Sequence, residues 1–126
     1  MSEPPMNETG NDWVRRPGMG FVWWCLPFGV GVAANFFASS ARSIAFVWVV
    51  MFAWMGTGCI LNALRCHRLH CYISGPLFFL GAVALALFAV GVAPLREQSL
   101  NNIVGITLVA ALLSFVPEMI WRKYVN

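Results

Sequence analysis

The sequence predicts an all-α fold, a polytopic transmembrane bundle of four helices. The first observation is composition: hydrophobic residues make up 60% of the 126 residues and charged residues only 10%, whereas a soluble domain carries about 25% charged residues. The second is the presence of four apolar stretches of about 20 residues, the length that a helix needs to cross a bilayer. The third is the shortness of the connections, which favours antiparallel neighbours. This composition excludes a soluble enzyme and a disordered chain.

The elements follow in order along the chain. Residues 1–18 are polar and proline-containing, so we expect a disordered cytoplasmic tail before one transmembrane domain, 19–126. The four spans are predicted at about 20–39, 43–64, 73–94 and 102–121, and none contains Lys, Arg or Asp. Ser74-Gly75-Pro76 predicts the start of the third span, with proline in the first turn, and Pro94 predicts its end.

Basic residues set the orientation of a multi-span protein. With four spans, both termini and the middle connection share one side, which carries six basic residues against two on the other: Arg15, Arg16, Arg65, Arg68, Arg122 and Lys123 against Arg42 and Arg96. We therefore expect a bacterial-type inner (plasma) membrane protein with both termini in the cytoplasm. A cleaved signal peptide fits less well, because the next span begins directly after the small residues 39–41.

The middle connection, 65–72, concentrates the residues that can carry chemistry. Both histidines and two of the four cysteines fall between Cys66 and Cys71. Thiolates and imidazoles are ligands of soft and borderline cations, although the C-x4-C spacing differs from that of a zinc ribbon. In a continuous helix, residues four apart share a face, so Cys66 would meet His70 and His67 would meet Cys71. Palmitoylation of the cysteines and contact of the histidines with lipid phosphates are the plainer interpretations.

Three further polar groups lie inside the predicted spans. The spacing of Cys59, Asn62, Cys66 and His70 puts them on one face of a helix, with Cys59 about 10 Å deeper in the membrane than Cys66. Cys25 in the first span is at a similar depth, so we predict that it faces Cys59, although packing is the plainer role for a lone membrane cysteine. Glu118 is the only acidic side chain in a span and is a candidate intramembrane acid, with an ion pair to Arg122 as the plainer alternative.

These groups predict a path along which a soft cation moves by ligand exchange toward the cytoplasm. Its ligands would be Cys25, Cys59, Cys66, His67, His70 and Cys71. We expect Hg²⁺ or Cu⁺ before Zn²⁺, no other cofactor, and no enzyme activity, because positioned acid–base groups are missing. Expected partners are the lipid bilayer, a second copy or a larger membrane complex, and a cytoplasmic metal acceptor. Nucleic acid is excluded by the lack of a basic patch.

A second function of a different class is a small accessory or structural subunit of a larger membrane protein complex. Four apolar helices without a catalytic centre suit that role. Co-purification of stoichiometric partner chains in mild detergent would distinguish it from a metal carrier.

Four spans, a cysteine in the first span and a cytoplasmic cysteine pair resemble the bacterial mercuric-ion uptake proteins. The resemblance covers the architecture of most of the chain and includes no matched signature. The family has two neighbouring cysteines in its first helix, whereas Trp24-Cys25-Leu26 offers one. The resemblance implies that Cys25 receives the ion and that Cys66 and Cys71 pass it to a cytoplasmic reductase.

Overall fold

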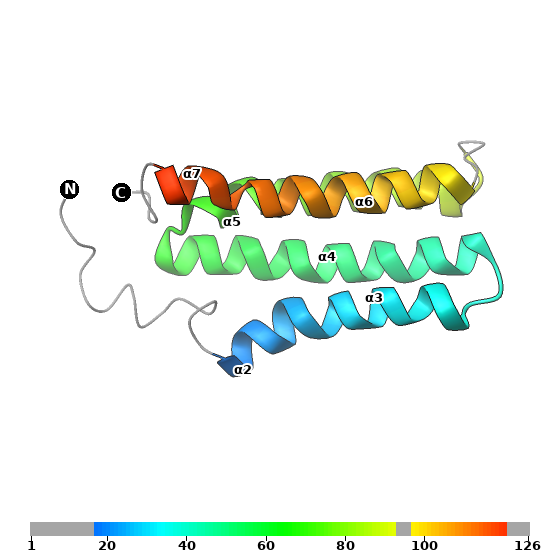
Figure 1. The fold of residues 1–126 in the computed structure, drawn as a ribbon, viewed down its shortest axis with the longest axis horizontal. Coiled ribbons are helices and arrows are strands. Elements are labelled where there is room, and N and C mark those ends of the chain that lie inside the picture. The colour runs from blue at the N-terminus through cyan, green and yellow to red at the C-terminus, as the bar shows by residue number, and fades with distance from the viewer. Residues whose placement is uncertain (1–16, 93–96, 121–126) are drawn as a thin grey trace.

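A computed structural model describes residues 17–92 and 97–120, and within these ranges it confirms an all-α four-helix bundle without strands (Figure 1). The elements are α2 (Pro17–Gly20), the π-helical turn η2 (Phe21–Cys25), α3 (Leu26–Phe37), α4 (Ala41–Cys66), α5 (Leu69–Ala89), α6 (Glu97–Leu113) and α7 (Phe115–Ile120). Four stretches are long and apolar enough to cross a membrane: Gly18–Phe37, Ala41–Arg65, Leu69–Ala89 and Gln98–Ile120. The protein is therefore a multi-pass membrane protein. Residues 1–16 of the predicted tail lie outside the described residues.

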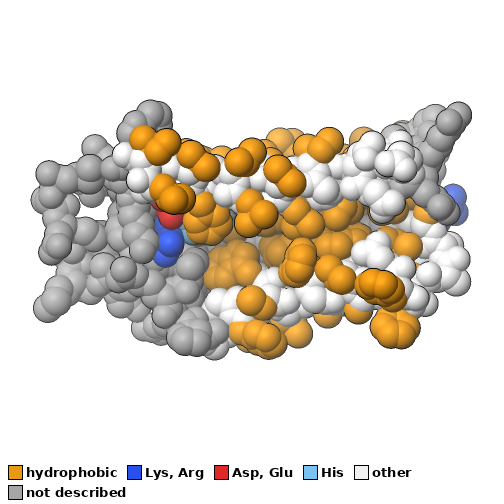
Figure 2. All heavy atoms as spheres, viewed as in Figure 1, with side chains coloured by type: hydrophobic (Ala, Val, Ile, Leu, Met, Phe, Trp, Pro, Cys, Tyr) orange, Lys and Arg blue, Asp and Glu red, His pale blue; other side chains and the backbone are white. Residues whose placement is uncertain are grey.

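The four spans pack in chain order as antiparallel neighbours (Figure 1). The α4–α5 pair forms the most extensive contact, with α3 against α4 and α6 against α5. Fully buried Trp48, Phe52 and Leu85 lie at the centre of the core, and the rings of Trp48 and Phe52 are 5.2 Å apart. The outer faces carry exposed apolar side chains (Figure 2), as a surface in contact with lipid requires.

The third helix begins at Leu69, so the predicted start at residue 73 and the predicted eight-residue connection are wrong. Ser40 caps the start of α4 by accepting a hydrogen bond from Ser43 N. The helix ends at Cys66 because the next residue, His67, adopts a left-handed conformation with φ 55°. Only His67 and Arg68 separate α4 from α5. Pro76 therefore lies inside α5 rather than in its first turn.

The third helix also ends earlier than predicted, at Ala89 rather than at Pro94. Gly91 has φ 78°, and the amides of Gly91 and Val92 bond back to the carbonyls of Phe88 and Leu87. These two bonds form a Schellman motif, which glycine permits because it adopts positive φ without strain. Gly91 was therefore the stop signal, and Pro94 lies outside the described residues.

Gly31 allows α3 to pack closely against α4. A Cβ atom at Gly31 would lie 2.7 Å from the ring of Trp48, whereas a Cβ at Gly29 would meet nothing within 4 Å. Trp48 is 1% exposed and its ring contacts Phe52, so it has no room to withdraw. The close contact of α3 with α4 therefore requires glycine, which has no Cβ atom, at position 31.

We expect Gly31→Ala to destabilise the protein relative to Gly29→Ala by about 1–3 kcal/mol, because the added methyl group overpacks the interface. Both changes bring the same gain in helix propensity, so their difference isolates the clash. Thermal unfolding of the two variants in the same detergent measures it. Equal melting temperatures would contradict the close packing of α3 on Trp48.

Candidate functional site

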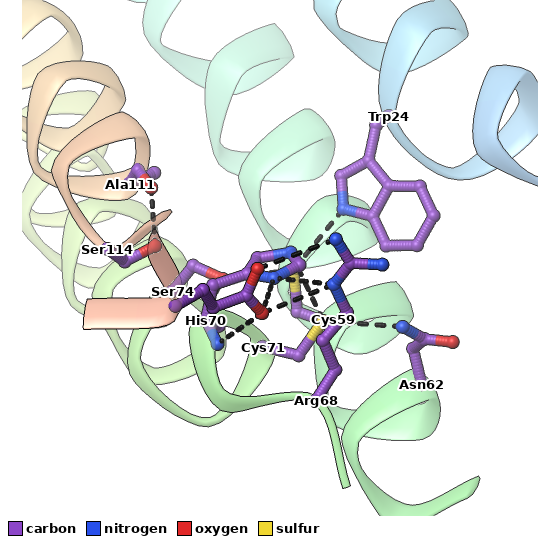
Figure 3. A network of polar contacts seen from close by, with 10 residues as sticks. Trp24, Cys59, Asn62, Arg68, His70, Cys71, Ser74, Ala111 and Ser114 are labelled. Atoms are coloured by element: carbon purple, nitrogen blue, oxygen red, sulfur yellow. Dashed lines mark hydrogen bonds and ion pairs between the residues drawn. The ribbon is translucent and has the colours of Figure 1, made fainter. Parts of the chain in front are cut away.

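A cluster of buried polar side chains lies at the end of the bundle where α4 turns into α5 (Figure 3). Its members come from η2, α4, α5, α7 and the α4–α5 turn: Trp24, Cys59, Asn62, Arg68, His70, Cys71, Ser74 and Glu118. Polar groups buried in an apolar bundle are expensive unless they are paired. Their concentration at one place makes this cluster the candidate functional site.

Two thiols that are not disulfide-bonded lie at the centre of the cluster. The thiols of Cys59 and Cys71 form a hydrogen bond with each other, and both residues are at most 1% exposed. Trp24 Nε1 donates to Cys59 Sγ at 3.2 Å, and Asn62 Nδ2 donates to Cys71 Sγ at 3.4 Å. The Ser74 hydroxyl lies 3.3 Å from Cys59 Sγ. We call Cys59 and Cys71 the thiol pair.

Two local features of the backbone bring these groups together. A Cβ atom at Gly75 would lie 2.9 Å from Ile60 Cγ1 and 3.6 Å from Cys59 Cβ, so glycine lets α5 approach α4 at the thiol pair. Pro27 has no N–H for a hydrogen bond one turn back, and the chain before it widens into η2, where Leu26 N bonds to Phe21 O. A π-helical turn shifts the register of the side chains on a helix. In this chain the π-helical turn contains Trp24, the residue that donates a hydrogen bond to Cys59.

Glu118 joins α7 to the start of α5. Its carboxylate accepts hydrogen bonds from Arg68 Nε at 3.2 Å and Nη2 at 3.4 Å. It also accepts from His70 N at 3.1 Å, so it satisfies one of the amides that every helix N-terminus leaves without an internal partner. The side chains of Arg68 and Glu118 are 8% and 6% exposed. The negative carboxylate also suits the positive end of the helix dipole.

The imidazole of His70 connects the carboxylate to the thiol pair. His70 Nδ1 lies 2.7 Å from Glu118 Oε1, and Nε2 lies 3.4 Å from Cys71 Sγ. The ring stacks on Phe115 with centroids 4.0 Å apart. Carboxylate, imidazole and two thiols therefore form one connected chain of polar contacts.

Three of the six predicted ligands, Cys59, His70 and Cys71, lie together in this chain. Cys25 is exposed and does not face Cys59 as predicted, because its neighbour Trp24 occupies that position. Neighbouring residues of a helix point in different directions, so Trp24 and Cys25 cannot both contact Cys59.

The remaining predicted ligands flank the α4–α5 turn. Cys66 is the last residue of α4, and its side chain lies outside the described part of the structure. His67 is exposed, and its Nδ1 lies 2.9 Å from the hydroxyl of Tyr72. The condition for a helical contact of His67 with Cys71 is not met, because the left-handed residue at 67 interrupts the helix on which that spacing depended.

Sequence reasoning missed three members of the cluster, namely Trp24, Arg68 and Ser74, whereas Asn62 was already on the predicted helical face with Cys59. Arg68 was used only to predict the orientation of the protein in the membrane. The ion-pair partner considered for Glu118 was Arg122, which lies outside the described residues. One signal was available: an acid in a span needs a buried cation, and Arg68 and Glu118 were predicted at the same membrane face. The hydrogen bonds to sulfur had no signal in the sequence.

The cluster offers pairs of donor atoms rather than a closed metal cage. Within residues 17–92 and 97–120, no group of three or more His, Cys, Asp or Glu side chains is arranged to hold a metal ion. Soft thiolate ligands favour Cu⁺ among the biological cations.

Comparison of the chain with known protein families, with characterised proteins and with solved structures finds no match. The resemblance to the mercuric-ion uptake proteins therefore stays a prediction.

We expect Glu118→Gln to destabilise the protein by about 3–5 kcal/mol, because it leaves the Arg68 guanidinium buried without a countercharge. The double variant Arg68→Met/Glu118→Gln removes both charges and should recover most of the loss. Thermal unfolding in detergent measures both variants. A double variant as unstable as Glu118→Gln alone would contradict an ion-pair origin of the effect.

Proposed function

We propose that this protein binds a soft cation, Cu⁺ or Hg²⁺, between the thiols of Cys59 and Cys71 and passes it toward the cytoplasm. The observation that supports this proposal is the thiol pair itself: two buried thiols, neither of them in a disulfide, in hydrogen-bond contact across the α4–α5 interface. Two sulfur donors on neighbouring helices match the preference of such cations for thiolates.

The surroundings of the thiol pair favour a bound cation over a small uncharged ligand. Binding displaces the thiol protons, so the pair becomes two thiolates around Hg²⁺, with no net charge, or around Cu⁺, with one negative charge. The N–H groups of Trp24 and Asn62 point at the two sulfur atoms. Hydrogen bonds from N–H groups to an ionised acceptor are stronger than those to a neutral one, so these donors support the bound state.

The same geometry argues against a cysteine nucleophile. An activated nucleophile needs a base within hydrogen-bond reach, and His70 Nε2 lies near Cys71 Sγ. However, Cys71 is 0% exposed, so a carbonyl substrate would have to displace packed helices before it could meet the sulfur. A single ion needs far less room. We therefore take the protein to be a carrier rather than an enzyme.

We place the thiol pair near the cytoplasmic face of an inner membrane. Arg65 lies in the last turn of α4 and Arg68 in the α4–α5 turn, whereas Arg42 lies at the opposite end of α4. Six basic residues on the side of this turn and two on the other predict cytoplasmic termini. The cation would then move from Cys59 toward the turn and on to a cytoplasmic acceptor.

The four cysteines provide a matched pair of variants for testing metal binding. Cys59→Ser/Cys71→Ser removes the thiol pair and should bind neither Cu⁺ nor Hg²⁺. Cys25→Ser/Cys66→Ser keeps the thiol pair and should bind one ion per chain. Metal content of the full-length protein in detergent, measured by mass spectrometry after anaerobic loading and desalting, tests this expectation. Cellular accumulation of each metal at matched membrane levels should follow the same order.

Two results would count against the proposal. If both double variants bind like the wild type, the thiols are packing residues. If only Cys25→Ser/Cys66→Ser loses the ion, the site lies at those two cysteines instead. Separate tests with Cu⁺, Hg²⁺ and Zn²⁺ identify the preferred cation.

Reporter fusions test the orientation. A fluorescent protein that folds only in the cytoplasm should fluoresce when fused after Asn126, and alkaline phosphatase fused there should be inactive. Fusions to the chain truncated after Ser39 should give the reverse result, because one span separates the two positions. Active phosphatase on the full-length chain would place the α4–α5 turn on the other side of the membrane.

A further inference from the structure

We propose that His70 receives the cation from the thiol pair, and that Glu118 is the positioning residue that holds the His70 ring for this step. The inference rests on the proposed function and adds the order of ligands. It also assigns a role to Glu118, which has no role in the proposed function.

Cys71 is common to two donor pairs. Its thiol contacts Cys59, and its Sγ lies 3.4 Å from His70 Nε2. An ion held by Cys59 and Cys71 can therefore exchange one ligand, Cys59 for His70, while Cys71 stays bound. Figure 3 shows these three side chains close together within the polar cluster. The step needs no third ligand in the resting site, which agrees with the absence of a three-donor group among the described residues.

The contacts of His70 Nδ1 indicate which of the two ring nitrogens carries the proton and which has a free lone pair. Nδ1 lies 2.7 Å from Glu118 Oε1 and 3.1 Å from Arg68 Nε. A lone pair on Nδ1 would repel the carboxylate at the shorter distance, so we assign the ring proton to Nδ1, which donates it to Glu118. Arg68 Nε, 3.2 Å from the same oxygen, then donates to Glu118. The lone pair of Nε2 is left directed at Cys71.

This arrangement is what a metal-binding histidine requires. Such histidines almost always donate their other ring N–H to a carboxylate, carbonyl or water, which fixes the orientation of the ring and raises its basicity. Glu118 supplies the carboxylate here. Phe115 restrains the other direction of motion, because its ring stacks on the imidazole at an interplanar angle of 21°.

A break between α6 and α7 puts Glu118 and Phe115 in place. Pro117 has no N–H to bond to the carbonyl four residues earlier, and α6 ends at Leu113, before Ser114. Ser114 Oγ donates to the Ala111 carbonyl at this break. Phe115 and Glu118 then lie in the short helix α7, which packs on α5.

The imidazole also favours one of the two cations. Imidazole is an established ligand of copper, whereas the softest cations bind thiolates by preference. Transfer from a sulfur pair to a sulfur–nitrogen pair therefore suits Cu⁺, and Cu⁺ is the probe for the test.

The test separates binding from release in the full-length protein in detergent, loaded anaerobically with one equivalent of Cu⁺. Release is followed in a stopped-flow instrument by adding a water-soluble Cu⁺ chelator that becomes coloured on binding. We expect His70→Gln and Glu118→Gln to bind one Cu⁺ through the intact thiol pair and to release it about tenfold more slowly than the wild type. Tyr72→Phe is the control: it removes only the hydroxyl beside the exposed His67, outside the contacts of the thiol pair and His70, and should release Cu⁺ at the wild-type rate.

The double variant Arg68→Met/Glu118→Gln controls for the loss of stability that Glu118→Gln alone causes. It removes the unpaired guanidinium, so slow release in this variant is due to the missing carboxylate rather than to misfolding. X-ray absorption at the copper edge gives an independent signature. During release, the wild type should show a nitrogen ligand that is absent from His70→Gln.

Each outcome decides between the two proposals. Wild-type release rates in His70→Gln and Glu118→Gln, with one Cu⁺ bound to each, overturn the role of His70 and leave the thiol pair as the binding site. Loss of Cu⁺ binding in His70→Gln also overturns the order of ligands, because His70 would then belong to the resting site. A wild-type protein that binds no Cu⁺ and no Hg²⁺ overturns the proposed function as well.

Discussion

A carboxylate buried in an apolar bundle must be neutralised and hydrogen-bonded, and Glu118 meets both needs at the start of α5. It pairs with Arg68, accepts from the amide of His70, and holds the His70 ring. The rest of the site depends on this carboxylate. It permits α5 to begin at Leu69, which gives the two-residue turn, and it leaves His70 Nε2 facing Cys71.

Irregular backbone is used where the polar groups have to converge. Two prolines lie close to these places. Pro27 follows the π-helical turn that contains Trp24. Pro117 lies in α7, which begins with Phe115 after the break at Ser114. Regular helices would leave Trp24 and Glu118 on faces set only by the helical period. Each departure from regularity instead delivers a side chain to the α4–α5 interface. The chain therefore builds its one buried polar cluster in the described residues at the positions where its helices are interrupted.

The sequence was sufficient to predict the class and number of the helices, because length and apolar composition alone decide what can cross a bilayer. It misplaced both ends of the third helix. Ser74-Gly75-Pro76 has the form of a helix start, yet burial of His70 and Cys71 against α4 and the cap from Glu118 extend α5 past it. A tertiary contact with a residue 48 positions away is not visible to a local pattern.

For the site, the sequence indicated the important residue types and missed the partners. The concentration of Cys and His at 66–71 and the lone acid in a span were both visible without a structure. The pairing of Cys59 with Cys71 rather than with Cys25 was not, because it depends on the close approach at Gly75 and on the register shift at η2. Helical spacing relates residues on one helix, whereas this pair forms between two helices.

The position of the thiol pair also restricts the route by which the proposed cation would reach it. Cys59 lies 18 residues from the start of α4, about 27 Å along the helix, and the aromatic layer of Trp48, Phe52 and Phe78 fills the core in between. This layer offers no ligand to a cation, so a route along the axis of the bundle is closed. Trp24 of the first span covers one side of the thiol pair. Only 11% of the residues in the apolar stretch of this span are buried. The least buried helix of the described bundle therefore covers the thiols, and displacement of this helix disturbs less packing than any route through the core.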